Sequence, residues 1–340
     1  MRKTTIKDVA KKAEVSVATV SRTLNDPDSV KKSTREKVLD TVEKMEYDPN
    51  PVAKALRLNK VNSIGLIVPN ITNTSMAEII RGAHEELGDH GYNTVLFNSG
   101  EDFRREEHFC EIIQNTMVDG VIFVTGTGAT PPVEMLSSDL AACLINRKSE
   151  LEYVDQVMAD EEEGMKLLTY HFNRMGHKRI GFITGNQQTS ATKNKLKGYK
   201  NFFENNELEF NNEYVVSGNW TIEGAFLAMK ELLGLKEKPT AVIIGTDTMA
   251  LGALSAIRDS GLSIPEDIAI SGFDNSPSSE YYTPPLTTLK YPNYKLGKLS
   301  ARSILNRLEN PDREKKNINI PLDIMIRKSC GYRIGFDQNR

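Results

Sequence analysis

Short apolar runs alternate with segments of helical periodicity along most of the chain. Seven apolar runs predict strands: residues 63–69, 92–99, 118–125, 141–146, 178–185, 240–246 and 267–273. Helical periods follow the first two runs, over residues 76–90 and 104–116. Because strands that alternate with helices form parallel sheets covered on both faces, we predict an α/β region of doubly wound parallel sheets. The pattern runs twice, with a break near residues 160–164, which indicates two subdomains.

The first 45 residues follow a different pattern, in which apolar positions recur only at helical spacing. Thr5 is predicted to cap a first helix, and Asp8 closes a capping box three residues later. The apolar positions of this helix are Ile6, Val9, Ala10 and Ala13. Glu14 and Val15 are predicted to form a turn, and Ser16 is the predicted cap of the next helix.

The second and third helices complete an all-α unit. In the second helix, Val17, Val20 and Leu24 are predicted to face inward. Its outward positions are Ala18, Thr19, Ser21 and Arg22. A third helix is predicted to follow a cap at Ser33, where Glu36 closes a second capping box. The buried positions of the third helix are Val38, Val42 and Met45. We interpret the unit as a helix-turn-helix.

The second helix suits the major groove of DNA, where the first residues of such a helix touch base edges. Val17 and Ala18 are small and apolar and would contact thymine methyl groups. Arg22 could pair with a guanine or hold a phosphate, and the pattern leaves both roles open. The candidate phosphate contacts are Ser16, Thr19 and Ser21. Thr5 and Asn25 complete the candidate DNA-binding set for these helices. The alternative is an ordinary three-helix packing unit.

Charge favours DNA binding over that alternative. Residues 1–60 hold 14 Lys and Arg against 9 Asp and Glu, a net charge of +5. The remaining residues hold 29 and 37, a net of −8, and the two values sum to the chain's −3. The excess positive charge, which would attract DNA phosphates, therefore lies in the same part of the chain as the predicted helix-turn-helix.

A second predicted DNA-binding element follows at residues 50–57. Pro49 ends the third helix, Asn50 can cap, and Pro51 suits the first position of a new short helix. Ala53 and Leu56 are its apolar positions, and such a side chain can wedge between base pairs in the minor groove. A helix of one or two turns is marginal by itself, so we expect it to form only with DNA and a second copy. The alternative is a plain linker.

Composition excludes several classes of protein. The 340 residues are 39% hydrophobic and 26% charged, which suits a small head and a large globular region. There is no run of about 18 apolar residues, and MRKTTIKDVA lacks the apolar stretch of a secretion signal. Cys110, Cys143 and Cys330 lie far apart and are predicted to be buried thiols. We expect a cytoplasmic protein that contacts no membrane.

The sequence carries no recognisable catalytic constellation. The five histidines are scattered, and there is no Ser-His-Asp order, metal-ligand cluster or glycine-rich phosphate loop. Gly126 and Gly128 are too weak a signal for a nucleotide site. Glu161 and Glu163 are interpreted as a solvated helix start. We therefore expect no enzymatic activity, no metal and no cofactor.

Eight motifs follow one another along the chain: TIKDVAKKAEVSVATVSRTLN, STREKV, YDPNPVAKALR, SIGLIVPNI, GHKRIGFITG, TDTMALGAL, IPEDIAISGFDN and PPLTTL. In this order and spacing, over roughly residues 4–332, the chain resembles the lactose-repressor/galactose-repressor family. The resemblance implies a repressor, usually a dimer, that binds a palindromic operator and responds to a sugar, a nucleobase or a phosphoprotein partner. It places Val17, Ala18 and Arg22 at base-reading positions and Leu56 at the intercalating lever. Glu14 departs from the family, which usually has Gly or Asn there.

The resemblance also implies a domain organisation. Residues 1–48 would form the helix-turn-helix head, 49–61 the hinge helix or linker, and 62–340 a periplasmic-binding-protein-like body for effector binding and dimerisation. The chain would cross between two subdomains near residues 160, 288 and 320. The first subdomain would then hold residues 62–160 and 288–320, and the second would hold residues 161–287 and 321–332.

Ligands of such sheets bind outside the carboxyl ends of the strands, here in the cleft between subdomains. The family's effector contacts, transferred position by position, are Asn73, Ser75, Met76, Asn146, Thr189, Lys195, Trp220, Asp247 and Asp274. Trp220 could stack on a sugar ring or a base, or it could be ordinary core packing. Asp274 could accept two ligand hydroxyls, whereas Asp247 is predicted to cap a helix. Lys195 stands where many relatives have arginine, which leaves room for a phosphorylated or carboxylated effector.

We therefore predict a homodimeric repressor whose affinity for double-stranded operator DNA is switched by a small molecule, a sugar, sugar phosphate or other polar metabolite. Such a ligand acts only if it prefers one arrangement of the dimer. One alternative is a cytoplasmic small-molecule-binding protein, similar to periplasmic sugar carriers in its two-lobed body. Another is a regulator controlled by a protein co-regulator instead of a metabolite.

Overall fold

The computed structural model describes residues 4–47, 61–115, 118–124 and 132–332. It divides into two compact units, Met1–Val61 and Asn62–Arg340. The predicted hinge positions Ala53 and Leu56 lie outside the described residues. In the part of the chain that is described, no helix combines the length and the apolar character that a membrane span requires.

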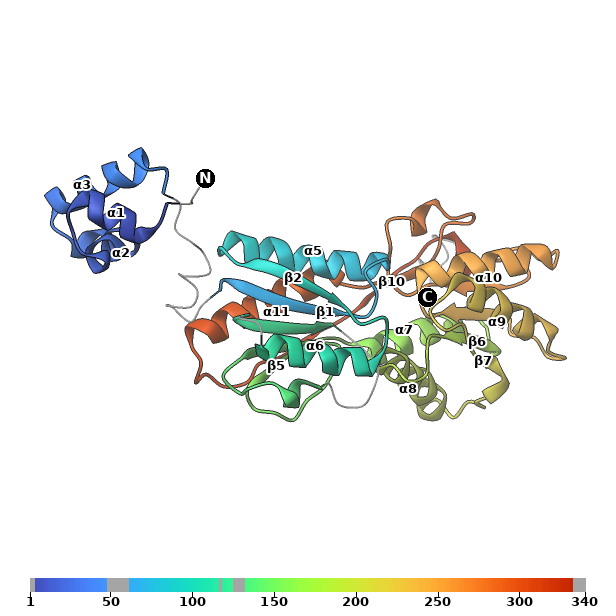
Figure 1. Cartoon of the computed structure of the whole chain (residues 1–340). Helices are drawn as coiled ribbons and strands as arrows, with labels where there is room; N and C mark the ends of the chain where they lie inside the picture. The colour runs from blue at the N-terminus through green and yellow to red at the C-terminus, as the bar shows by residue number, and fades with distance from the viewer. Residues whose placement is uncertain (1–3, 48–60, 116–117, 125–131, 333–340) are drawn as a thin grey trace, which may run out of the picture. The chain divides into compact units, whose positions relative to one another are not determined.

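The first unit is the predicted all-α head (Figure 1). Its elements are α1 (Ile6–Ala13), α2 (Val17–Asn25), η1 (Pro27–Ser29) and α3 (Lys32–Lys44). Thr5 caps α1: its hydroxyl accepts from the Asp8 N–H, and the Asp8 carboxylate accepts from the Thr5 N–H at 3.0 Å. Glu14 ends α1 with φ 53°, the left-handed conformation that the turn requires. Ser16 then caps α2 by accepting from the Thr19 N–H at 3.0 Å.

The start of α3 differs from its prediction. The helix begins at Lys32, Lys31 occupies the cap position, and no side chain caps it, so Ser33 and Glu36 form no capping box. Arg35 bonds instead to Asp28 at 2.7 Å and ties the first turn of α3 to η1. Contacts with the rest of the head, including burial of Val38, therefore set where the helix begins.

The second unit contains two lobes. The first lobe has a six-stranded sheet in the order β11-β5-β4-β3-β1-β2, and every neighbouring pair is parallel. Its strands are β1 (Ser63–Val68), β2 (Asn93–Asn98), β3 (Gly120–Val124), β4 (Ala141–Ile145), β5 (Val154–Ala159) and β11 (Asn317–Ile320). The strands β1, β3 and β4 are almost wholly buried, as the continuous apolar runs predict.

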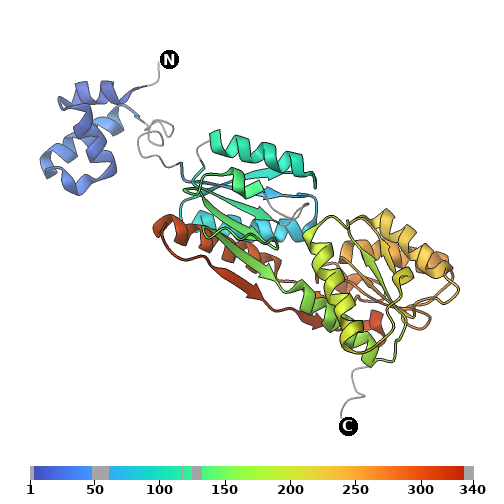
Figure 2. The ribbon, with the colours of Figure 1, turned by 90° about the horizontal axis from the view of Figure 1, so that it is seen from below.

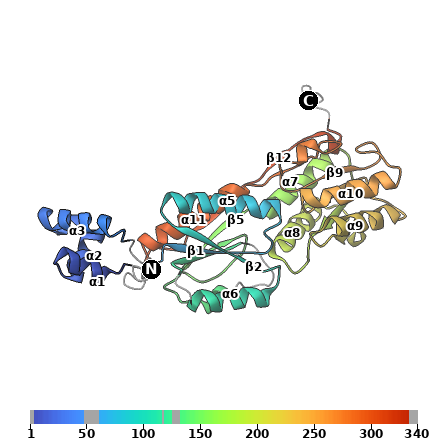
Figure 3. The ribbon, with the colours of Figure 1, turned by 45° about the horizontal axis from the view of Figure 1, so that its top comes forward.

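Helices cover both faces of this sheet. α5 (Thr74–Asp89) and α11 (Asn293–Glu309) lie on one face, and α6 (Phe103–Asn115) lies on the other (Figures 1 and 3). Gly82 of α5 and Gly297 of α11 allow the two helices to approach closely, because a Cβ at either position would collide with the backbone of the opposite helix. The two helices on this face therefore pack closely against each other.

The second lobe has a four-stranded parallel sheet in the order β7-β6-β8-β9. Its strands are β6 (Ile180–Thr184), β7 (Val215–Ser217), β8 (Ala241–Ile244) and β9 (Ala269–Ser271). α9 (Ile222–Gly234) and α10 (Asp247–Asp259) pack on one face. α7 (Glu161–Arg174) and α8 (Ser190–Asn205) pack on the other. Both lobes thus have the doubly wound architecture predicted from the alternation of strands and helices.

The chain passes between the lobes three times (Figure 2). It leaves the first sheet after β5 to begin α7, and it returns through β10 (Thr288–Lys290) to begin α11. It leaves again after β11 through β12 (Asp323–Met325), which pairs antiparallel with β10. The observed crossings lie close to the positions that the family resemblance implies.

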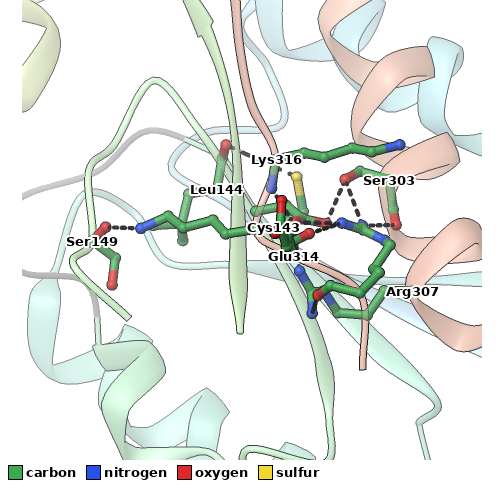
Figure 4. Close-up of polar contacts among 10 residues, drawn as sticks. Cys143, Leu144, Ser149, Ser303, Arg307, Glu314 and Lys316 are labelled. Carbon is green, nitrogen blue, oxygen red and sulfur yellow. Dashed lines mark hydrogen bonds and ion pairs between the residues drawn. The ribbon is translucent and has the colours of Figure 1, made fainter. Parts of the chain in front are cut away.

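A buried ion cluster joins β5 to the segment between α11 and β11. Asp155, fully buried at the start of β5, accepts from Arg307 at 2.7 Å, from Ser303 at 2.6 Å and from Arg313. Its carboxylate also accepts the Lys316 N–H at 2.9 Å. Ser303 and Arg307 extend from α11 toward this segment (Figure 4). Burial by itself raises the pKa of Asp155, but these hydrogen bonds outweigh it and hold the pKa below its ordinary value.

The three cysteines, Cys110, Cys143 and Cys330, are free and buried, as predicted. Burial raises the pKa of the Cys143 thiol to about 12. A thiol with so high a pKa is unreactive at neutral pH. We assign the cysteines to packing.

Candidate functional site

The outward face of α2 is the first candidate site. Ser16, Ala18 and Arg22 are exposed, as predicted for DNA-contacting positions. Thr19 is half-buried, and its hydroxyl lies 2.8 Å from that of Ser16. Thr5 is also half-buried, and its hydroxyl is already bonded to Asp8 at 2.6 Å. The side chain of Asn25 lies outside the described residues.

Two positions of α2 differ from the predicted faces. Val17 was predicted to point inward but is 41% exposed, because the core of the head reaches Val20 and not the first residue of the helix. Its exposure agrees with the base-contacting role also predicted for it. Ser21 was predicted to point outward but is buried, so it is poorly placed to contact a phosphate. Thr23, also fully buried, bonds to the Thr19 carbonyl and shares the inner face with Val20.

A cleft between the two lobes is the second candidate site. It contains about 710 Å³ of empty space, part of it open to solvent, which suits a small molecule. The carboxyl ends of strands from both sheets reach it, as expected for doubly wound sheets. The lining residues are Pro69, Asn70, Asn73, Ser75, Met76, Ile79, Glu101, Asn146, Glu161, Thr189, Ala191, Lys195, Trp220, Thr246, Asp274, Tyr291 and Asn293.

Eight of the nine predicted effector positions line this cleft: Asn73, Ser75, Met76, Asn146, Thr189, Lys195, Trp220 and Asp274. Two of them also begin helices, since Asn73 caps α5 and Thr189 caps α8. Asn146 connects the lobes, because its carbonyl accepts from Ser190 at 3.0 Å. Its side chain donates to the Tyr291 hydroxyl at 2.7 Å. The cleft is therefore lined by side chains that are already held in place.

Asp247 is the exception, and its predicted role as a helix cap is wrong. The cap of α10 is Thr246, whose hydroxyl accepts the Met249 N–H at 3.1 Å. Asp247 is fully buried and does not line the cleft. Its carboxylate accepts the N–H groups of Phe273 at 3.0 Å, Asp274 at 3.3 Å and Ser276 at 2.7 Å, and the Thr288 hydroxyl at 2.6 Å. Asp247 thus positions the loop that carries Asp274.

Nine further lining residues were not among the predicted positions, and three of them, Glu161, Tyr291 and Asn293, follow strands that carry the chain between the lobes. Glu161 is only 3% exposed, so its interpretation as a solvated helix start is wrong. Its carboxylate accepts from Tyr291 at 3.0 Å and from Asn194 at 3.1 Å. Glu161 follows β5, and Tyr291 and Asn293 follow β10. Neither strand was recognised in the sequence. The rule that ligands bind after the carboxyl ends of strands therefore could not identify these residues.

Lys195 is the cation of the cleft. It is only 3% exposed, and its Nζ donates to the Gly245 carbonyl at 2.9 Å. The same atom lies 3.7 Å from the centre of the Phe273 ring and 5.2 Å from that of Trp220. Burial lowers the pKa of Lys195, against the opposing effect of nearby carboxylates. The ammonium is thus held by a carbonyl and aromatic faces.

Trp220 forms one wall of the cleft. It is half-buried, it has φ 60°, and its ring lies against Gly185, where any Cβ would collide with the indole. One side of the ring packs on the second-lobe core while the residue also lines the cleft. The position of the ring is therefore compatible with both predicted roles of Trp220, core packing and ligand stacking.

Known proteins match both units. Residues 5–50 match the bacterial regulatory proteins of the lacI family, and residues 169–330 match the periplasmic binding protein-like domain. Catabolite control protein A of Priestia megaterium is 35% identical over 327 residues, which are 96% of this chain and 98% of that protein. The chain belongs to the lacI family.

Other transcriptional regulators match over nearly the same length. The transcriptional repressor PurR of Vibrio campbellii is 31% identical over 96% of this chain and 98% of that protein. The Lac repressor dimer bound to operator and the anti-inducer ONPF has a TM-score of 0.86 at 25% identity, covering 97% of this chain and 99% of that one. The regulator CelR in complex with cellobiose has a TM-score of 0.73 at 28% identity, covering 96% and 100%.

Asp274 carries a strongly perturbed carboxyl group in the cleft of this lacI-family chain. Burial and then the neighbouring Asp247 carboxylate raise its pKa to about 8, although Lys195 and Ser75 act to lower it. The hydrogen bond from Ser75, at the start of α5, joins the two lobes. The protein alone therefore stabilises the ionised form of Asp274 poorly.

Replacing Asp274 with asparagine is expected to change how stability depends on pH. Between pH 3.8 and about 8 the unfolded chain loses this proton while the folded chain keeps it, so the group lowers wild-type stability as pH rises through that window. In Asp274→Asn this contribution is absent, and the variant should gain stability relative to wild type from pH 5 to about pH 8. Urea unfolding across that range measures the difference. Asp139→Asn, at an exposed position, should follow wild type; a constant offset for Asp274→Asn would contradict the raised pKa.

Proposed function

We propose that this protein is a ligand-responsive transcriptional repressor that binds operator DNA as a homodimer. One observation carries the proposal: a single chain holds a helix-turn-helix with an exposed second helix and a ligand-sized polar cleft. The lacI-family relatives include named repressors and a dimer solved on its operator. Neither unit alone accounts for both features.

The head supports DNA binding through shape and charge. Arg22 is exposed, and Val17 and Ala18 offer a small apolar surface at the start of α2. These are the positions from which a helix in the major groove contacts bases. The net charge of +5 over residues 1–60 supplies the nonspecific attraction to phosphates. We propose Ser16, Thr19, Thr5 and Asn25 as supporting contacts, with Ala53 and Leu56 at the hinge.

Exposed apolar side chains on the body support a dimer. Val95 and Leu96 of the first lobe are 38% and 47% exposed. In the second lobe, Leu251 on α10 is 42% exposed and Tyr281 is 79% exposed. A second copy covering these side chains would remove them from water and would match the two-fold symmetry of a palindromic operator.

The cleft supports control by a small molecule. Its walls come from both lobes, and Ser190 and Ser75 bond across it to Asn146 and Asp274. A ligand that binds one arrangement of the lobes more tightly shifts the dimer toward that arrangement and changes DNA affinity. We propose ligand contacts from Asn73, Ser75, Met76, Asn146, Thr189, Lys195, Trp220 and Asp274, and a positioning role for Asp247. We place the protein in the cytoplasm because its proposed target is DNA, and we propose binding instead of catalysis.

Selection of DNA from a random pool by the full chain tests the proposal. Enrichment of a palindrome that one dimer binds at both half-sites would support it. An operator affinity that falls steeply as the salt concentration rises would also support it. A thermal-shift screen of sugars, amino sugars, sugar phosphates, nucleobases and carboxylates then identifies the ligand, which must also change operator affinity. No sequence preference in the selection would refute repression. If the chain binds a specific operator but no compound in the screen changes that binding, control by a protein co-regulator is favoured instead.

Arg22→Ala is expected to weaken binding to the selected operator by about tenfold or more, because a charge-assisted contact to a base or phosphate is lost. The head should remain folded, since Arg22 is exposed. Fluorescence anisotropy with labelled operator measures the affinity, and circular dichroism checks the fold. Lys44→Ala removes another exposed cation, paired with Asp40 on α3, and should have a smaller effect. Equal losses of operator affinity in both variants would show that Arg22 contributes only its charge and makes no specific contact.

A further inference from the structure

Acidic side chains outnumber basic ones in the lining of the cleft. Three carboxyl groups line it, from Glu101, Glu161 and Asp274, against the single ammonium of Lys195. Two of the carboxyls come from segments that follow strands of the first sheet, and Asp274 follows β9 of the second. The cleft therefore has an excess of potential negative charge on both walls. The inference about the ligand that this excess selects rests on the proposed function of the cleft as the effector site.

Lys195 does not neutralise these groups by direct pairing. Its hydrogen bond goes to the Gly245 carbonyl at 2.9 Å, and its ammonium lies 3.7 Å from the centre of the Phe273 ring. Within the described ranges of the chain, no ion pair joins Lys195 to a carboxylate. It is therefore also poorly placed to act as the anchor of an anionic ligand, which was one of the possibilities left open by the sequence.

The partners of the carboxyl groups are neutral. Glu161 accepts from the Tyr291 hydroxyl at 3.0 Å and from the Asn194 amide at 3.1 Å. Asp274 accepts the Asp247 N–H at 3.3 Å and bonds to Ser75. Burial is the main reason that the pKa values of Glu101, Glu161 and Asp274 are all raised. The protein therefore stabilises the ionised forms of these carboxyl groups poorly.

A separate observation also indicates a missing donor. Asn293 lines the cleft and is 8% exposed, and its side-chain oxygen has no hydrogen-bond partner among the described residues. A buried amide oxygen without a donor is unfavourable, so such atoms in native proteins usually have a partner in the functional state. A ligand with N–H or O–H groups would supply it. An ionised phosphate or carboxylate group placed there would not.

We infer that the cleft binds an amine-bearing polyol, of the amino-sugar class, with its ammonium held by the carboxylates of Glu161 and Asp274. Its hydroxyls donate to acceptors such as the Asn293 side-chain oxygen, and its carbon skeleton packs against Trp220. A phosphorylated or carboxylated ligand would add negative charge beside three carboxyl groups whose ionised forms the protein already stabilises poorly, so it should bind more weakly. A neutral sugar supplies hydrogen-bond donors but no cation that would stabilise the ionised carboxylates.

Titration calorimetry on the full chain tests this with three matched sets of probes. Glucosamine, mannosamine and galactosamine are compared with glucose, mannose and galactose, and with the 6-phosphates of those three sugars. The best amino sugar should bind about tenfold or more tightly than its parent, because hydrogen bonds to charged groups are stronger than neutral ones. The phosphates should bind more weakly than the parents. Binding of the amine should also release protons, seen as a dependence of the heat on buffer, because a bound cation lowers the raised carboxyl pKa values.

Glu161→Gln supplies the matched variant. It retains the size of the side chain and removes its charge, so the preference for amine over parent sugar should largely disappear while parent binding persists. Glu163→Gln, in the same turn of α7 but exposed, should retain the full preference. Circular dichroism and operator binding of Glu161→Gln show whether the variant is folded.

Three results would overturn the inference: tighter binding of a phosphate than of its parent, equal binding of amine and parent, or no saturable binding by any of the three amino sugars. An unaltered amine preference in Glu161→Gln would do the same. The proposed repressor function is judged separately by operator selection. A neutral or anionic ligand that changes operator affinity would leave that function intact while refuting this ligand class.

Discussion

Asp155→Ala is expected to lower the free energy of unfolding by about 3–5 kcal/mol, the usual loss when one partner of a buried ion pair is removed. Asp155 is fully buried and accepts from Arg307, Arg313, Ser303 and the Lys316 backbone. Without it, two guanidinium groups remain in the protein interior with no carboxylate to balance them. Urea unfolding of the full chain, followed by circular dichroism, measures the loss.

Two controls separate this cluster from general effects of lost charge. Asp139→Asn removes an exposed carboxylate and should change stability by about 0.5 kcal/mol or less. Asp155→Asn keeps the shape of the side chain and should lose less than alanine, which provides a folded comparison if the alanine variant expresses poorly. Because the folded pKa of Asp155 lies below its unfolded value, its contribution is present above the unfolded pKa and is lost as pH falls through the folded pKa. The gap between wild type and variant should therefore narrow in acid; a gap independent of pH would contradict the role assigned to the charge.

Trp220→Ala is expected to weaken ligand binding about 30-fold or more, the loss typical of a buried aromatic anchor in a binding site. The ring lies against Gly185 and lines the cleft, so its removal takes away a wall of the site. Operator affinity without ligand should be unchanged, since the head is a separate compact unit. Calorimetry with the compound from the thermal-shift screen and anisotropy with operator measure the two affinities.

Trp220→Phe retains an aromatic face and should lose much less affinity than Trp220→Ala. Tyr170→Ala, a 47% exposed aromatic on α7 outside the cleft, should bind like wild type. Because Trp220 is the only tryptophan of the chain, its fluorescence in wild type also reports ligand binding directly. If Trp220→Ala binds the ligand with wild-type affinity, Trp220 does not contact the ligand and serves only in core packing.

The head shows how far local signals reach. The capping box of Thr5, the cap of Ser16 and the apolar spacing located α1 and α2, because a cap depends on residues only three positions apart. The same reasoning misplaced the start of α3, where Arg35 contacts Asp28 and the helix has no side-chain cap. It also assigned the wrong faces to Val17 and Ser21, because the extent of the core depends on how three helices pack together.

Strand recognition had a similar limit. Continuous apolar runs identified β1, β3, β4, β6 and β8, which are buried on both faces. The strands β5, β7, β10, β11 and β12 were missed because they are short or contain polar residues, as in VDQVMA and NINI. Their backbone pairing, and not an apolar pattern, makes them strands.

By itself, then, the sequence determined the class of the protein, which has a cationic helical head and an α/β body of two sheets. It also identified most of the cleft residues that follow the well-marked strands. These features depend on near neighbours in the chain and on periodicity. Only the tertiary structure decided that Glu161 is a buried cleft residue, that Asp247 supports the loop of Asp274, and that Lys195 bonds to a carbonyl. Each of these roles depends on partners far away in sequence, and burial, which sets the charge and hydrogen bonding of a side chain, exists only once those partners have packed together.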